Sequence, residues 1–136
     1  MSVLRSATKF LIAGLLLSVA SVSFAARDAD LETPAPITIP QGKTVKDVKE
    51  AISLGATARN WTTKELAPGI VEVSTNVRNK HQLAVELKYD AKQIGLTYKS
   101  SGNLDYAEVD GKVKIHKNAN SWMKNLMGDI NTFLNR

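Results

Sequence analysis

The chain contains no cysteine, and this absence removes several classes of function at once. Disulfide frameworks, thiol nucleophiles and thiolate zinc sites all need cysteine. A bacterial lipoprotein also needs a cysteine at its cleavage site, where the lipid is attached. We therefore expect a fold held together by an ordinary apolar core, with no lipid anchor.

Catalytic and metal-binding motifs are equally scarce. The only histidines are His81 and His116, and two imidazoles do not complete a zinc site. The sequence has no HExxH, GxSxG or glycine-rich phosphate loop. The segment 105–111 faintly resembles a calcium loop, but Ala107 and Val109 stand where oxygen ligands are needed. We predict no enzyme activity, no metal and no cofactor. A small hydrolase built around His116 is the enzymatic alternative.

Aromatic residues make up only 6% of the chain. Tyr89 and Tyr98 fall on the apolar side of predicted strands, where core packing accounts for them. A sheet that binds single-stranded nucleic acid presents aromatics among basic residues on its exposed face. The exposed positions here carry no aromatic side chain: Glu86, Lys88, Thr97 and Lys99. Nucleic acid is therefore not an expected partner.

Only one long apolar run occurs, from Phe10 to Ala20. Arg5 and Lys9 precede it, and a cut after Ala25 would follow a short stretch of small residues. This pattern predicts a secretory signal peptide over residues 1–25. The run is shorter than the roughly 20 apolar residues of a membrane span. We expect a periplasmic or secreted protein with no membrane span after cleavage.

The net charge is +5, and it falls to +3 once Arg5 and Lys9 leave with the signal peptide. A mildly basic surface suits anionic partners such as lipopolysaccharide phosphates. The same charge is common in proteins that bind nothing anionic, so it does not identify a partner.

The remaining chain divides into a linker and one domain. Residues 26–36 are polar and end in Pro34 and Pro36, which predicts a linker. Residues 37–136 are predicted to form a single domain. It begins with a short extended piece at 37–40 and a helix over 44–58, where Thr44 and Asp47 suit a capping box.

Alternating apolar and polar residues predict four strands, and short connections favour an antiparallel meander. A brief strand at Val113 and Ile115 leads to a last helix over 120–133 with a broad apolar stripe. The predicted fold class is α+β: a two-layer sandwich with two helices on one face of the sheet and a wet opposite face. The four strands are predicted at 61–66, 70–77, 83–89 and 94–98.

Two stretches carry a resemblance to a known group. Trp61, His81, "YDAKQIGLTYKSSGNL" and "IHKNANSWMKNL" resemble small uncharacterised bacterial envelope proteins with a tryptophan-headed meander and an IHKN-x-N-x-W helix. The likeness covers most of residues 37–134. The chain departs from the group at Ala119, where an aromatic residue is usual. The resemblance implies an export signal and an α+β fold, and it implies no activity.

The sharpest functional signal is the row of positive charges before the last helix. Helix starts favour anions, because their first N–H groups are unpaired and the macrodipole is positive there. Asn118 or Asn120 is expected to cap the helix. The alternative is that these lysines are solvated surface. The candidate ligand-binding residues are Lys112, Lys114, His116, Lys117, Asn118 and Asn120.

We therefore predict a non-enzymatic envelope protein that binds an anionic envelope ligand at the start of its C-terminal helix. The alternative is a structural module that docks another envelope protein through its exposed sheet face or an edge strand. In that alternative Glu86, Lys88 and Thr97 would matter more than the lysines.

Overall fold

The computed structural model describes residues 27–136, so the predicted signal peptide lies outside the described residues. This part of the chain forms two helices and eight strands. Their bounds are β1 Asp28–Asp30, β2 Ile37–Thr38, α2 Val45–Ala58, β3 Thr62–Ala67, β4 Ile70–Val77, β5 His81–Tyr89, β6 Gln93–Gly102, β7 Ala107–Val109, β8 Lys112–His116 and α3 Lys117–Leu134.

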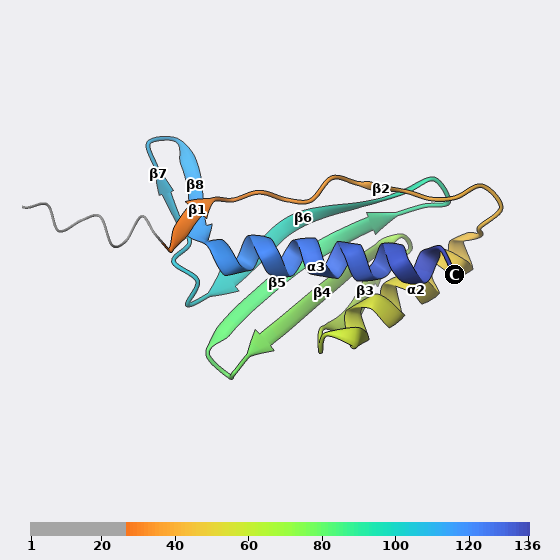
Figure 1. Cartoon of the computed structure of the whole chain (residues 1–136), viewed down its shortest axis with the longest axis horizontal. Coiled ribbons are helices and arrows are strands. Elements are labelled where there is room, and N and C mark those ends of the chain that lie inside the picture. Colours follow the sequence, from red (N-terminus) through yellow and green to blue (C-terminus); the bar gives the residue numbers. More distant parts are fainter. Residues whose placement is uncertain (1–26) are drawn as a thin grey trace, which may run out of the picture.

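Five strands form the main sheet in the order β2-β6-β5-β4-β3, with every neighbouring pair antiparallel (Figure 1). Its register places Val71 opposite Leu87, and Leu87 opposite Leu96, so apolar side chains gather on one face. The connections are tight turns, and Gly69 takes a positive φ of 79° between β3 and β4. The predicted meander is confirmed.

Both helices cover the apolar face of this sheet. The helix α2 begins with the expected capping box: Asp47 N donates to Thr44 Oγ1 at 3.2 Å, and Thr44 N donates to Asp47 Oδ2 at 2.8 Å. The hydrogen bond from the Thr44 backbone lowers the pKa of Asp47. Gly55 lets α3 pack against α2 closely, because a Cβ there would lie 2.6 Å from Ile130 Cγ1.

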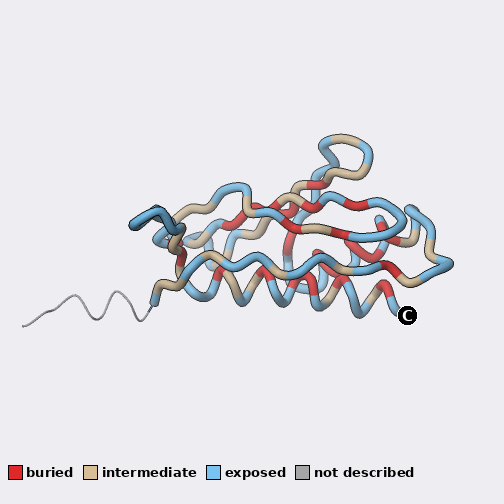
Figure 2. The backbone as a smooth tube through the Cα atoms, turned by 90° about the horizontal axis from the view of Figure 1, so that it is seen from above, coloured by how far each residue is buried: buried red, intermediate tan, exposed pale blue. Residues whose placement is uncertain are grey.

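The core lies between the helices and the sheet (Figure 2). Val73 and Val85 contribute from the strands, and Met123 and Leu126 contribute from α3; all four are fully buried. Trp61 is 5% exposed and closes the core where α2 passes into β3. The α+β two-layer class is confirmed. Within residues 27–136, neither helix combines the length and apolarity that crossing a bilayer requires.

A second, three-stranded sheet was not expected from the sequence. It has the order β1-β8-β7 and stands beside the start of α3 (Figure 1). Its strand β1 falls inside the segment 26–36, whose composition predicts a linker. Asp28–Asp30 instead pairs with β8, and Leu31 N donates to Val113 O at 2.9 Å. A three-residue strand with two aspartates has no apolar alternation, so its pairing depends on a partner far along the chain.

Candidate functional site

The predicted anion-binding residues do come together at the start of α3. The strand β8 confirms the expected brief strand and aligns Lys112, Lys114 and His116 along one side. The strand β1 lies directly beside them, with Asp28 opposite His116 and Asp30 opposite Lys114. The chain therefore places two of its own carboxylates against its basic segment.

Lys114 is neutralised by this arrangement. Its Nζ lies 2.5 Å from Asp30 Oδ1 in an ion pair between half-exposed side chains. The hydrogen bond from Lys114, together with its charge, lowers the pKa of Asp30. An anion that sought Lys114 would have to compete with a carboxylate already in contact.

The helix start itself differs from the prediction. The helix α3 begins at Lys117 rather than near Asn120, and His116 caps it instead of Asn118 or Asn120. His116 Nδ1 accepts a hydrogen bond from Asn118 N at 3.1 Å, and Lys117 N donates to Arg27 O at 2.8 Å. Because β8 runs into α3 without a loop, the last strand residue must act as the cap. The N–H groups of the first two helical residues are thus occupied.

Asn120 fastens β1 to the helix. Its Nδ2 donates to Asp30 O at 2.8 Å, and its Oδ1 accepts from Glu32 N at 3.0 Å. Ala119, the neighbouring residue, is fully buried. The side-chain amide of Asn120 therefore satisfies two backbone groups of the N-terminal segment, and it is engaged within the molecule.

Asp28 differs from these residues in having a side-chain oxygen that is unpaired in the described part of the chain. Its Oδ1 is buried and has no hydrogen-bond partner within residues 27–136. Burial raises the pKa of Asp28, and a hydrogen bond with Asp105 and the charge of Asp105 raise it further. The charges of Arg27 and His116 act in the opposite direction. Arg27 also forms an ion pair with Asp105, in which Arg27 Nη2 lies 3.6 Å from Asp105 Oδ2.

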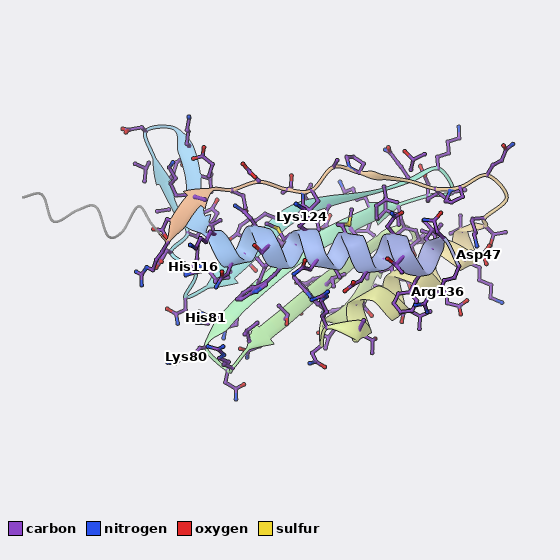
Figure 3. The ribbon with its side chains drawn as sticks, viewed as in Figure 1. Asp47, Lys80, His81, His116, Lys124 and Arg136 are labelled. Atoms are coloured by element: carbon purple, nitrogen blue, oxygen red, sulfur yellow. The ribbon has the colours of Figure 1, made fainter. Side chains whose placement is uncertain are left out.

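His81 and His116 lie at the same end of the molecule, while Asp47 and Arg136 lie at the opposite end (Figure 3). His81 Nδ1 hydrogen-bonds to Asn103 O at 2.9 Å, and its ring centroid is 6.5 Å from that of Trp122. No group of three or more histidine or acidic side chains in residues 27–136 is arranged to hold a metal ion.

The residues behind the family resemblance have structural roles at this junction. Ile115 is fully buried, and the N–H of His116 donates to Leu104 O at 2.7 Å. Leu104 is 2% exposed, so the "NL" of the first stretch anchors the "IH" of the second. Together with the cap and the Asn120 contacts, these interactions account for the spacing of the motif without a ligand.

A second polar region lies on the open face of the five-stranded sheet, away from the helices. It is a hollow of about 460 Å³. Eight of its eleven lining residues carry uncharged side chains that are able to form hydrogen bonds, and none of the eleven is charged or aromatic. The lining residues are Asn60, Thr62, Ser74, Thr75, Asn76, Gln82, Leu83, Ala84, Ser100, Ser101 and Gly102.

The register of the sheet explains this lining. Thr62, Ser74, Ala84 and Ser100 stand opposite one another across β3, β4, β5 and β6. Ala84 is 9% exposed and occupies the middle of this row, where its small side chain leaves space above it. The hollow therefore follows from small residues on consecutive strands.

Several polar groups in the hollow have no partner in the described part of the chain. Thr62 Oγ1 lies 3.2 Å from Ser74 Oγ, and these two hydroxyls form a pair. The side chains of Asn76, Gln82 and Ser100 form no hydrogen bond within residues 27–136. Gly102 makes room for Gln82, because a Cβ at Gly102 would lie within contact distance of the Gln82 amide oxygen.

Sequence reasoning did not identify this hollow. The polar positions of the strands predicted a wet face, and that was correct. The additional signal was the lack of charged residues at neighbouring positions of four strands, and it becomes visible only once the register of the sheet is known. The charged half of the same face holds Glu72 and Lys99, whose side chains form an ion pair of 3.6 Å.

A hollow of similar volume lies at the other end of the molecule, between the start of α2 and the end of α3. Three of its four charged side chains are already engaged within residues 27–136, and Glu50 is the exception. Lys43 Nζ donates to Arg136 O at 3.2 Å, Asp47 belongs to the capping box, and the Arg136 guanidinium lies 4.4 Å from the centroid of the Phe133 ring. This second hollow offers fewer free groups to a ligand.

Comparisons with known protein families, curated proteins and solved structures found no match to this chain. The resemblance to small envelope proteins therefore stays a prediction.

Proposed function

We propose that the protein is a non-enzymatic binding module of the bacterial cell envelope, periplasmic or secreted, whose ligand lies on the open face of the five-stranded sheet. One observation carries this proposal: a hollow of about 460 Å³ combines many uncharged hydrogen-bonding side chains with no charged residue. Its volume falls in the range of about 300–1,000 Å³ that is usual for ligand sites.

The lining favours a neutral, hydroxyl-rich ligand such as a short glycan. Hydroxyl and amide side chains both donate and accept hydrogen bonds, so they match a ligand that does the same. An anion would find no cation in the hollow. A protein partner is less well matched, because protein interfaces are enriched in aromatic residues, methionine and arginine, and none of these lines the hollow.

The same lining predicts weak binding. No aromatic ring is available to stack on the ligand, so affinity depends on hydrogen bonds that replace contacts with water. We expect a dissociation constant of about 1 mM for a single short glycan, which corresponds to about −4 kcal/mol. A polymer that touches several copies of the protein would bind more tightly through effective concentration.

The anion site at the start of α3 is the second candidate. Lys112 and Lys117 favour it, because neither forms an ion pair in the described part of the chain. The occupied N–H groups, the Asp30–Lys114 pair and the engaged Asn120 weigh against it. The third candidate is docking of a protein on the charged half of the sheet face, through Glu86, Lys88 and Thr97.

One titration separates these candidates. Amide chemical shifts of the ¹⁵N-labelled protein would be followed while a neutral N-acetylglucosamine tetramer or inorganic phosphate is added. We expect the tetramer to shift Ser74, Gln82 and Ser100. Shifts confined to 112–123 on addition of phosphate would support the anion site instead. No shift with up to about 20 mM tetramer would contradict the glycan proposal, given the affinity expected above.

A pair of variants sharpens this test. Ala84→Tyr places a ring in the hollow and should abolish the shifts caused by the tetramer. Thr97→Tyr places the same ring on the same sheet face, but outside the hollow, and should leave them unchanged. Equal effects of both variants would mean that the tetramer does not lie in the hollow.

A further inference from the structure

The two sides of β6 are very unequally paired. Towards β5 its ladder extends from Ile94 opposite Tyr89 to Gly102 opposite Gln82. Towards β2 it pairs only at Ile94 with Ile37 and at Gln93 with Thr38. On that second side the stretch Gly95–Gly102 has no backbone hydrogen-bond partner within residues 27–136.

The segment Leu31–Pro36, here called the strap, runs beside the first part of this unpaired edge and diverges from β6 towards the start of α3 (Figure 1). At one end it is held by two hydrogen bonds, in which Leu31 N donates to Val113 O and Glu32 N donates to Asn120 Oδ1. At the other end it is held by the pairing of β2 with β6. Between these ends Thr33, Pro34, Ala35 and Pro36 form no hydrogen bond with the described residues. The prolines have no N–H to donate.

A gap separates the strap from the sheet. Its volume is about 370 Å³, and its lining includes Thr33, Pro34 and Pro36 from the strap and Gly95 and Thr97 from β6. The strap therefore covers the edge at Gly95–Thr97 without pairing with it. Unpaired N–H and C=O groups along a strand are a template for another strand, and covering them with a loop is a known protection.

The opposite edge of the sheet is protected differently. The strand β3 carries the exposed Lys64 at its centre, and its register shifts between Glu65 and Ala67. A central lysine and a bulge both discourage pairing. These features are built into β3 itself, whereas the protection of β6 depends on a segment that is held only at its ends.

We infer that the edge of β6 is a strand-acceptor site, and that an extended segment of a partner polypeptide pairs with Gly95–Gly102 by displacing the strap. Backbone groups would supply the hydrogen bonds of such a complex, and alternate side chains would supply selectivity. Ser100, Ser101 and Gly102 also line the hollow that carries the proposed glycan binding, but the acceptor site uses the backbone groups of β6 that point towards the strap.

The side chains along β6 define the partner's pattern. Tyr98 lies on the helix-covered side, and its ring stacks on that of Tyr106 at 4.8 Å between centroids and 8° between planes. Thr97 and Lys99 are exposed, and Lys99 reaches Glu72 on the open side. The matching segment has apolar residues at every second position, on the side of Tyr98, and polar residues between them, on the open side with Thr97.

Amide hydrogen exchange of the free protein tests the premise. Along Gly95–Gly102 the amides that point to β5 should exchange slowly, and those that point to the strap should exchange at least about 100-fold faster, since they have no partner. Uniform slow exchange along this stretch would mean that the edge is already paired, and the inference would fail.

A peptide tests the site itself. The probe is a capped synthetic copy of β5, HQLAVELKY, which already pairs with the other side of β6 and alternates as required. It should shift and protect the strap-side amides of 95–102. The control is the same peptide with proline in place of its central valine, which removes a donor and should not bind. Equal binding of the two peptides, or shifts centred on Ser74 and Gln82, would overturn the inference.

Releasing the strap provides an independent readout. Asn120→Ala removes both side-chain bonds that hold Asp30 and Glu32, so we expect the β5 peptide to bind about tenfold more tightly. Asn125→Ala, at an exposed position on the same helix, is the matched control and should leave the affinity unchanged. Unchanged binding in Asn120→Ala, with folding verified by circular dichroism, would show that the strap does not guard the edge.

Discussion

The start of α3 and the hollow on the open sheet face are both rich in polar groups, but their surroundings differ. At the start of α3 the polar groups contact one another: Asp30 with Lys114, His116 with Asn118, and Asn120 with the backbone of β1. In the hollow Asn76, Gln82 and Ser100 form no hydrogen bond within residues 27–136. The charged residues that stand out in the sequence contact one another where β1 and β8 meet the start of α3, a region called the junction below. The hydroxyls and amides of the hollow face open space.

This difference shows what a charge pattern in a sequence can and cannot indicate. A row of lysines before a helix indicates that a negative charge is favoured nearby. It does not indicate whether a ligand or another part of the chain supplies that charge. Here Asp30, on a strand more than eighty residues earlier in the chain, supplies a negative charge to Lys114. A neutral polar surface needs no counter-charge from the chain, so its groups stay free for a ligand. It also produces no charge pattern that could be recognised in the sequence.

The largest expected effect on stability comes from introducing a tyrosine in each region, at Ala119 in the start of α3 and at Ala84 in the hollow. Ala119→Tyr should destabilise the protein by about 3 kcal/mol, because Ala119 is fully buried against protein atoms and overpacking forces them apart. Ala84→Tyr should cost less than about 1 kcal/mol, because the hollow above Ala84 has room for the ring. Urea unfolding of both variants measures the difference in the free energy of unfolding.

Similar losses in the two variants would remove the distinction between a closed junction and an open hollow. The result also bears on the family resemblance. Where that group carries an aromatic residue, this chain has an alanine with no exposed surface. An Ala119→Tyr variant of unchanged stability would mean that the start of α3 can open to receive a side chain.

Glycines provide a second matched pair. Gly55→Ala should cost about 2 kcal/mol, because its Cβ would lie 2.8 Å from the Ile130 backbone and the two helices would have to separate. Gly102→Ala should cost less than about 1 kcal/mol, because its Cβ meets only the end of the flexible Gln82 side chain, which can swing into the hollow. Thermal unfolding with a common baseline measures both, and an equal cost would show that Gln82 is not free to move.

Much of the fold could be predicted from local patterns. Alternation in 70–77 and 83–89 gave strands close to β4 and β5, because one face of the sheet is dry and the other is wet. The spacing of Thr44 and Asp47 gave the start of α2, because a capping box involves only four consecutive residues. Each of these features depends on neighbours in sequence, which a pattern can represent.

The remainder could not be predicted, because it depends on partners far apart in the chain. Pairing of β1 with β8 requires contacts between residues near 29 and near 115, and Asp28–Asp30 carries no periodic signal. The helix start was misplaced for the same reason: only the arrival of β8 next to β1 makes His116 the cap. The hollow needs four strands in register before its neutral lining becomes apparent.

A smaller effect is expected from the pH dependence of the junction. Folding raises the pKa of Asp28, so the folded state favours the protonated carboxyl. The stability associated with this proton is fully present below the unfolded value of 3.8 and is lost as pH rises through the folded pKa. Asp28→Asn keeps the side chain neutral, so it should be more stable than the original protein at about pH 7 and nearly equal at about pH 3.

Asp30 gives the opposite sign and serves as the internal control. Its folded pKa is lowered by Lys114, so its contribution is present above 3.8 and is lost as pH falls through the folded pKa. Asp30→Asn should therefore weaken the protein at about pH 7 and matter less at about pH 3. Arg27, Asp105 and His116 also face Asp28, so both profiles should be repeated in an Asp105→Asn background. Profiles of equal sign for the two variants would contradict this assignment.

The smallest expected effect is at Lys112 and Lys117, the two basic residues of the junction that form no ion pair within residues 27–136. Lys112→Gln and Lys117→Gln should each change the free energy of unfolding by less than about 0.5 kcal/mol, because both side chains are exposed. Phosphate should shift the amides of 112–123 no more in the original protein than in the double variant. A shift that is present only in the original protein and fades with salt would mean that the junction binds anions through these two lysines. The start of α3 would then be a site as well as a junction, and the contrast with the hollow would lie in the charge of the ligand rather than in whether a ligand binds.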